Sequence, residues 1–401
     1  MHSEAFSHFD PSPRVLAGGG TLAGKRVAVQ SSISVKGWPT EAGSRALQGF
    51  VALEDATVVE RLLSAGSTLV GNTHSSELGF GLLRDRTVLA LRDGPADLAL
   101  MTDTMGEART AAACAGVFGF KPSYGRVSRF GLTGLVPSMD CCGILGAKLQ
   151  DIAAAFEAIR GRDERDPSMD DSGVPAGRRD FGGDNFAPSA GIVSQCLEIL
   201  DEGERAAFGK AIGKLREAGV RVREVQWEDF DLFRTVHNLV GSVEASSSCG
   251  KFDGVRYGHC VSGAKNWNEM YLRNRGESFS PLLKAYLFQG AYFQFENYHA
   301  FERACGIRRR LADAGRKLFD GLDLLVFPAR RAAVDATKAD TVERIYEAFS
   351  LTLPANVTGQ PALTLPGRDG DPGLQLVGPH FGDELLFEAA GLLFPRAEEA
   401  R

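Results

Sequence analysis

The stretch that most constrains the fold is residues 101–146, which begins MTDTMGEARTAAACAGVFGF. Polar residues and one glycine, from Asp103 to Gly106, come directly before Glu107 and a run of alanines, which is the composition of a turn from a strand into a helix. The first backbone N–H groups of a helix have no partner inside the helix. We therefore predict a turn that can hold a negative charge or a developing oxyanion.

The residues around this turn alternate between the two regular patterns. Short apolar runs at 26–30, 68–71 and 97–101 are typical of buried strands, and residues 52–65 have apolar side chains at helical spacing. A strand, a helix and another strand in succession indicate an α/β fold.

Several longer segments point to one family. After the turn come AACAGVFGFKPSYGRVSRFGL and PSMDCCG, and SSSCGKFDGVRYGHC, NRGESFS, NVTGQPALTLP and GLQLVGP follow in that order. In these segments the chain resembles the amidase-signature enzymes, most closely the A subunits of glutamyl-tRNA(Gln) amidotransferases. The resemblance implies an α/β/α fold whose central, mixed, twisted sheet has helices on both faces. It also implies one domain over residues 25–395, a helical, aromatic-rich insertion at about 230–319, and a loose N-terminal arm at 1–24.

The family's catalytic residues are not matched. The family uses a serine nucleophile, a second serine with a cis peptide bond and a lysine that activates both. The resemblance puts Glu107 at the nucleophile's position and Gln30 at the lysine's position. The loop that carries the second serine has no counterpart in LLRDRTVLALRDGPADLAL. Ordinary amidase or glutaminase activity is therefore expected to be absent, while altered chemistry stays possible.

The role of Glu107 has two interpretations. A carboxylate at a helix start is favoured by the helix dipole and the free N–H groups, and more so when partly buried, so Glu107 is expected to stay ionised. It would then occupy or repel the charge that an oxyanion site stabilises. If burial raises its pKa, Glu107 could act as a general base. It could also fill a retired pocket. In each case Thr104, Met105 and Gly106 are the substrate-binding part of the turn.

Three further residues belong to the expected substrate pocket. The resemblance places Tyr257 and Arg275 in segments that frame an amino-acid pocket, where Arg275 would bind a carboxylate through its guanidinium or else form a structural ion pair. Phe349 occupies the position of the family's acidic partner. The insertion also holds an aromatic run, which we interpret as core: Tyr286, Phe288, Tyr292, Phe293, Phe295 and Tyr298.

Composition and charge limit the kinds of partner, cofactor and location that we expect. The net charge of −6 and a pI near 5.8 give no basic surface for direct nucleic-acid binding or for an anionic membrane. The seven cysteines are scattered without metal-ligand spacing, and no metal or cofactor motif is present. No apolar run reaches bilayer length, and the N-terminus lacks the pattern of a targeting peptide. We therefore expect a cytoplasmic protein without a cofactor.

The hypothesis that follows is a pseudo-amidase that keeps the fold and binds a small molecule or a protein partner without hydrolysing amides. One alternative is an enzyme that acts on an amide, acyl or related substrate with Glu107 as general base. Another is a non-catalytic scaffold subunit of an amidotransferase-like complex. The identity of the ligand or partner and the oligomeric state stay open.

Overall fold

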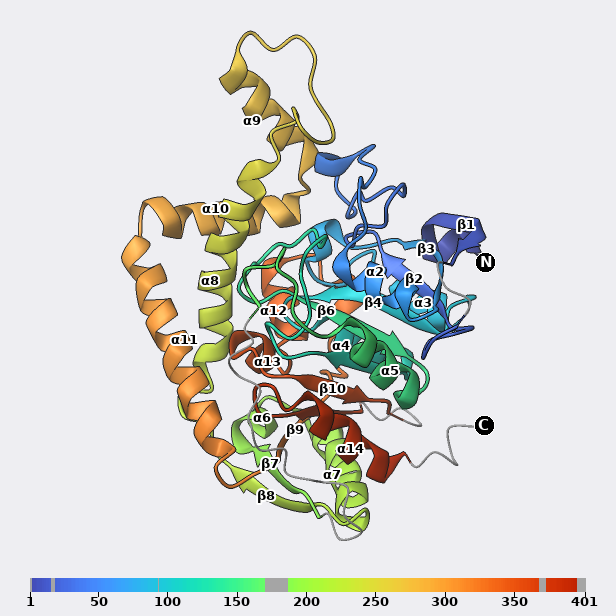
Figure 1. Cartoon of the computed structure of the whole chain (residues 1–401). Coiled ribbons are helices and arrows are strands. Elements are labelled where there is room, and N and C mark those ends of the chain that lie inside the picture. The colour runs from blue at the N-terminus through green and yellow to red at the C-terminus, as the bar shows by residue number, and fades with distance from the viewer. Residues whose placement is uncertain (1, 16–18, 93, 170–186, 368–372, 395–401) are drawn as a thin grey trace.

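A single sheet organises the computed structural model, which describes residues 2–15, 19–92, 94–169, 187–367 and 373–394 (Figure 1). Within these residues the sheet has 11 strands in the order β1-β3-β2-β4-β6-β5-β10-β11-β9-β7-β8. Parallel and antiparallel pairs both occur, since β2 lies parallel to β3 and β4, while β4 runs antiparallel to β6. The predicted mixed sheet is confirmed.

The strands are β1 Phe6–Arg14, β2 Arg26–Gln30, β3 Thr68–Thr73, β4 Leu98–Asp103, β5 Phe118–Lys121, β6 Cys141–Gly146, β7 Ser189–Val193, β8 Arg221–Val225, β9 Leu324–Pro328, β10 Ala362–Leu365 and β11 Leu374–Val377. The α-helices are α1 His2–Ala5, α2 Thr57–Ser64, α3 Thr87–Arg92, α4 Glu107–Ala115, α5 Leu149–Ile159, α6 Ser194–Glu198, α7 Glu202–Glu217, α8 Leu232–Ser248, α9 Trp267–Ser278, α10 Pro281–Phe295, α11 Tyr298–Leu318, α12 Val342–Ala348, α13 Leu353–Val357 and α14 Asp383–Leu393. Short 3-10 turns include Glu77–Gly79 before α3.

Two hydrophobic cores lie on the two faces of the sheet, because successive side chains of a strand point to opposite faces. In β4, Leu98 and Leu100 join the core under α2, α5, α7 and α14. Ala99 and Met101 join the core under α4, α8, α10 and α12. Helices therefore cover both faces of the sheet, as the predicted fold class requires.

The N-terminal segment differs from the expected loose arm. Residues Phe6–Arg14 form the edge strand β1, which pairs antiparallel with β3. Phe6 is 5% exposed and packs in the core. The sequence did not predict this strand because many of its residues are polar, and an edge strand buries only part of its side chains.

A helical layer separates β8 from β9 in the sequence. Helices α8 to α11 follow one another there, and α10 crosses α8 at the periphery of the molecule, beside α9 and α11 (Figure 1). Among the described residues, no helix has the length and apolar character needed to cross a bilayer.

Candidate active site

Thr352 packs tightly against the turn from β4 into α4. Gly106, which precedes α4, has φ 125°, a conformation that favours glycine. A Cβ at this position would lie 2.1 Å from Oγ1 of Thr352. That hydroxyl donates to the carbonyl of Met105 at 2.6 Å. The close approach of Thr352 fixes the direction of the backbone N–H groups that follow.

These N–H groups converge on the side chain of Glu107. Its Oε2 accepts hydrogen bonds from the backbone nitrogens of Thr104 at 2.8 Å, Met105 at 2.9 Å and Gly106 at 3.2 Å. Its Oε1 accepts from the backbone nitrogen of Gly81 at 3.3 Å. The turn thus places a carboxyl oxygen where three donors could hold an oxyanion.

The protonation of Glu107 is set by its surroundings. The side chain is 1% exposed. Burial, and then the charge of Asp103, raise the pKa of Glu107 to about 8, although the amides of Met105 and Thr104 act in the opposite direction. The expectation that Glu107 stays ionised is wrong, because it counted the favourable N–H groups and left out the larger cost of burying a charge. Glu107 is instead a carboxyl that titrates near physiological pH.

Gln30 lies at the end of β2 and is connected to the neighbouring strand β4. Its Oε1 accepts from the backbone nitrogen of Thr102 at 3.0 Å and from the hydroxyl of Ser32 at 2.6 Å. Its Nε2 donates to Asp85 at 2.7 Å. Burial raises the pKa of Asp85. Both ends of the Gln30 amide are hydrogen-bonded, so Gln30 connects the end of β2 to β4 just before the turn. It has no free group to act as a base.

A buried chain of hydrogen bonds supports the turn from the helical side. Nε2 of His237 lies 3.1 Å from the carbonyl oxygen of Thr104, and Nδ1 lies 2.9 Å from the hydroxyl of Tyr346. A carbonyl can only accept, so Nε2 carries the proton and Nδ1 accepts from Tyr346. The hydroxyl of Tyr286 lies 3.0 Å from that of Tyr346 and completes the chain. Burial lowers the pKa of His237 to about 4, so the ring is neutral at pH 7.

A second network under α4 was not anticipated from the sequence. The guanidinium of Arg109, 0% exposed, donates to both carboxylate oxygens of Asp103, at 2.9 and 3.1 Å. It also donates to the side chain of Asn356, whose own amide donates to Asp103 at 3.0 Å. Burial acts to raise the pKa of Asp103, but Arg109 holds that pKa below its usual value. The sequence signal was an arginine inside an alanine-rich helix, at a position expected to be buried.

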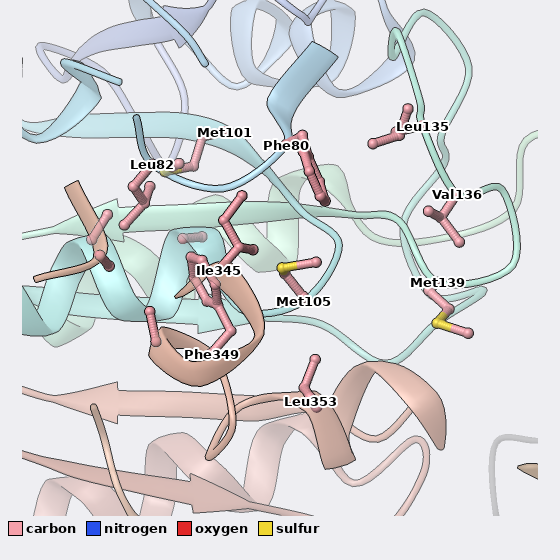
Figure 2. Close-up of a cluster of buried hydrophobic side chains, with 14 of the residues drawn as sticks. Phe80, Leu82, Met101, Met105, Leu135, Val136, Met139, Ile345, Phe349 and Leu353 are labelled. Carbon is pink, nitrogen blue, oxygen red and sulfur yellow. The ribbon is translucent and has the colours of Figure 1, made fainter. Parts of the chain in front are cut away.

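A hydrophobic cluster closes the site in this structure. Figure 2 shows Phe80, Ile345, Phe349 and Leu353 around Met105 in one buried cluster. Phe80 stacks on Tyr286 with the ring centroids 4.5 Å apart. The segment from Phe80 to Leu82 contacts Glu107 directly through the Gly81 amide.

Two of the three residues of the expected substrate pocket belong to one aromatic cluster: Tyr257 contacts Phe252, Phe252 contacts Phe279, and Arg275 lies over Phe279. Phe349 is 0% exposed, packs in the buried cluster around Met105 and accepts from Thr352 through its carbonyl. Arg275 lies on α9, where it donates to the carbonyl of Cys249 and lies over the ring of Phe279 at 5.1 Å. Tyr257 packs edge-on against Phe50. Among the described residues Arg275 has no carboxylate partner, because the aromatic ring and the carbonyl occupy its guanidinium.

An open cleft lies beside the segment from Phe80 to Leu82. Two adjoining cavities of about 440 and 510 Å³ share Gly43, Ser75 and Arg84 in their walls. The first is also lined by Ser76 and Phe80. Ser76 donates to the carbonyl of Gly81 at 2.7 Å, which connects the cleft wall to the segment over Glu107.

Some charged side chains of this cleft have hydrogen-bond partners, and others do not. Glu77 accepts from Ser44 at 2.8 Å and from the amide of Ser280 at 3.0 Å. By contrast, the guanidinium groups of Arg84 and Arg86 have neither a hydrogen bond nor an ion pair within the described part of the chain, and both are exposed. Exposed Glu4 lines the same cavity. The cleft therefore presents two arginines without hydrogen-bonded partners in the described residues, with the carboxylates of Glu4, Glu77, Glu277 and Asp340 also in its walls.

Comparison with known proteins is consistent with this architecture. The amidase family model matches residues 14–90 and 90–387. Two A subunits of glutamyl-tRNA(Gln) amidotransferases are similar in sequence. That of Natronomonas pharaonis is 33% identical over 93% of this chain and 96% of its own length, and that of Symbiobacterium thermophilum is 34% identical over 92% of this chain and 82% of its own length. The structure of the corresponding protein from Thermotoga maritima superposes with a TM-score of 0.77, at 24% identity over 98% of this chain and 88% of that one.

These relatives correct the functional hypothesis. The curated relatives align over nearly the whole chain and are named as amidotransferase subunits, and nothing in the comparisons indicates a retired enzyme. The prediction of a pseudo-amidase that only binds a ligand or serves as a scaffold is therefore wrong. It rested on three catalytic positions at which the chain differs from the family, whereas the likeness extends over nearly the whole chain. The chain belongs to the amidase family and is similar to the A subunits of glutamyl-tRNA(Gln) amidotransferases.

Proposed function

We propose that this protein is an amide-cleaving subunit of an amidotransferase-like complex, with its reaction centre at Glu107. The observation that carries the proposal is the identity of 33%, over 93% of the chain, to one of the A subunits of glutamyl-tRNA(Gln) amidotransferases. The convergence of three backbone donors on one carboxyl oxygen supports it locally.

In the proposed chemistry, Glu107 replaces the serine as the group that starts the reaction. A general base works best when its pKa is near the working pH, and the pKa of Glu107 is about 8. The ionised carboxylate takes a proton from a water molecule, whose oxygen forms a bond to the amide carbonyl carbon. The carbon–nitrogen bond then breaks, and Glu107 returns the proton to the leaving nitrogen. The products are a carboxylic acid and ammonia.

The amides of Thr104, Met105 and Gly106 have the second role. They now bind Oε2 of Glu107. When a substrate carbonyl takes that place and the carboxyl turns toward a water molecule, the same donors stabilise the developing oxyanion. His237 holds the Thr104 carbonyl, and Arg109 holds Asp103, so both act as positioning residues.

The cleft defines the substrate that we propose. Binding at Glu107 requires the segment from Phe80 to Leu82 to move, and the cleft lies along that segment. Arg84 and Arg86 would then bind a carboxylate of the substrate, as guanidinium groups do in many sites. An amide that also carries a carboxylate, such as glutamine or asparagine, has both groups.

Ammonia release by the purified chain tests the proposal, because every group named above belongs to this chain. Glutamine, asparagine and simple amides are incubated with the protein, with Glu107→Gln and with Glu217→Gln, which changes an exposed carboxyl of α7. We expect the protein and Glu217→Gln to release ammonia at the same rate, with the acid product detected by mass spectrometry. The absence of ammonia with all substrates would refute the proposal.

A further inference from the structure

Helix α10 has two apolar faces on opposite sides. The inner face consists of Leu283, Tyr286, Leu287 and Gly290, all buried. It packs against α8 so closely that a Cβ at Gly290 would lie 1.8 Å from the carbonyl oxygen of Ser242. This face accounts for the attachment of α10 to the rest of the protein and leaves the opposite face outside.

The outer face is a continuous stripe of exposed apolar side chains. Phe288 is 71% exposed, Tyr292 53% and Phe295 74%. Pro281 and Ala285 are also exposed and extend the stripe toward the start of the helix. These five positions follow one another at intervals of 4, 3, 4 and 3 residues, which is the spacing of a coiled-coil seam. The prediction that the aromatic run is core therefore holds only for its inner members, such as Tyr286.

The stripe carries no charge. Lys284 is the single charged residue within α10, and it is directed to the carbonyl of Gly276 in α9. A helix that is apolar on both faces is normally buried on both. At the periphery of the molecule, where Figure 1 shows α10, no described part of the chain covers the second face, so it is available to another molecule.

We propose that the partner is the α10 helix of a second copy of this chain, packed antiparallel about a two-fold axis at Phe288. In this arrangement Phe288 faces its own counterpart. Pro281 then faces Phe295, and Ala285 lies within one residue of the level of Tyr292, so that on either side of the axis a small side chain meets a large one. An isologous interface requires such self-complementarity. With no charge in the stripe, the two copies do not repel each other.

The area is sufficient for a specific contact. Tyr298, at the start of α11, is 52% exposed and lies one turn beyond Phe295 in sequence. Aromatic side chains bury about 200 Å² each when fully covered, so the four exposed rings would remove about 500 Å² per copy. The total of about 1,000 Å² reaches the lower limit expected of a biological interface. This inference does not depend on the proposed function.

A charge exchange at the two-fold axis tests the inference. The full chain, Phe288→Arg and Phe288→Glu are compared by sedimentation velocity over a range of concentrations. Leu53→Arg is the control, since Leu53 is 83% exposed outside the stripe. We expect the unaltered chain and Leu53→Arg to dimerise equally. Each Phe288 variant alone should have a dimer dissociation constant raised about tenfold or more, because like charges then face each other.

Mixing the two variants provides the decisive result. Phe288→Arg and Phe288→Glu together should form a mixed dimer, because opposite charges then meet at the axis. Circular dichroism and the melting temperature show whether each variant is folded, as expected for a residue with 71% exposure. A chain that stays monomeric at all concentrations would overturn the inference. So would a dimer that is unaffected by both Phe288 variants, or variants whose mixture shows no gain over each alone.

Discussion

The Oε2 atom of Glu107 lies 2.8 Å from the backbone nitrogen of Thr104, within a turn that directs two further N–H groups to the same oxygen. A group that can gain or lose a proton near pH 8 therefore occupies the three donors that we propose for an oxyanion. The protonation of Glu107 links the stability of the fold to the chemistry of the site.

The first prediction concerns Glu107 and stability. The folded-state pKa is about 8 and the ordinary value is 4.5, so the folded state keeps a proton that the unfolded chain has released between these pH values. The free energy of unfolding should therefore fall as pH rises through this window, by at most about 1.4 kcal/mol per pH unit. In Glu107→Gln this contribution should vanish. Urea unfolding of both proteins from pH 5 to 9 measures the difference, and parallel pH profiles would contradict the burial argument.

The second prediction concerns His237. Its folded-state pKa of about 4 is below the ordinary 6.5, so between these values the unfolded chain binds a proton that the folded state does not. Stability should therefore decrease as pH falls through this window. His237→Gln should weaken this acid dependence, whereas His299→Gln, at an imidazole with 77% side-chain exposure, should leave it unchanged. Melting temperatures of the three proteins against pH provide the measurement, and equal acid dependence in all three would refute the prediction.

The third prediction concerns the buried ion pair under α4. Arg109→Leu removes the guanidinium and leaves the carboxylate of Asp103, also 0% exposed, without its counter-charge. The expected loss is about 3–5 kcal/mol of unfolding free energy. Arg303→Leu, at an exposed arginine of α11, should cost far less. Chemical denaturation of both variants is the measurement, and similar small losses would show that the network under α4 contributes little.

The fourth prediction concerns the tight turn. Gly106→Ala combines a φ of 125° with a contact of 2.1 Å to Thr352, whereas Gly116→Ala has a φ of 68° and nothing within 4 Å. We expect Gly106→Ala to cost about 2 kcal/mol or more and Gly116→Ala about 1 kcal/mol. Thermal unfolding measures the loss of stability in both variants. An equal loss would mean that Thr352 can move away from the added methyl group at no cost.

The fifth prediction concerns the cations of the cleft. The double variant Arg84→Ala/Arg86→Ala should raise the KM for an amide that carries a carboxylate about tenfold, with kcat nearly unchanged, because the guanidinium groups bind the substrate away from the reacting atoms. Arg309→Ala, at a side chain with 88% exposure, serves as the control. An unchanged KM in the double variant would show that the cleft does not bind the substrate.

Local patterns in the sequence predicted the strands β2, β3 and β4 and the turn before Glu107. The mixed sheet followed only from the family resemblance, and the edge strand β1 was missed. The environment of Glu107 could not be predicted from local patterns, since the Gly81 amide that donates to its carboxyl is distant in sequence. The pairing of Arg109 with Asn356 likewise joins positions far apart in the chain. The outer stripe of α10 was misjudged because periodicity shows that a face is apolar and does not show what covers it.

The most direct test is the rate of ammonia release from glutamine as a function of pH, for the protein and for Glu107→Gln. We expect the rate of the unaltered protein to rise with pH and to level off above about 8, as Glu107 loses its proton. Glu107→Gln should be slower by about a hundredfold or more at every pH, since that is the usual contribution of a general base. Equal rates in the two proteins, or a rate that does not follow the titration of Glu107, would contradict the account.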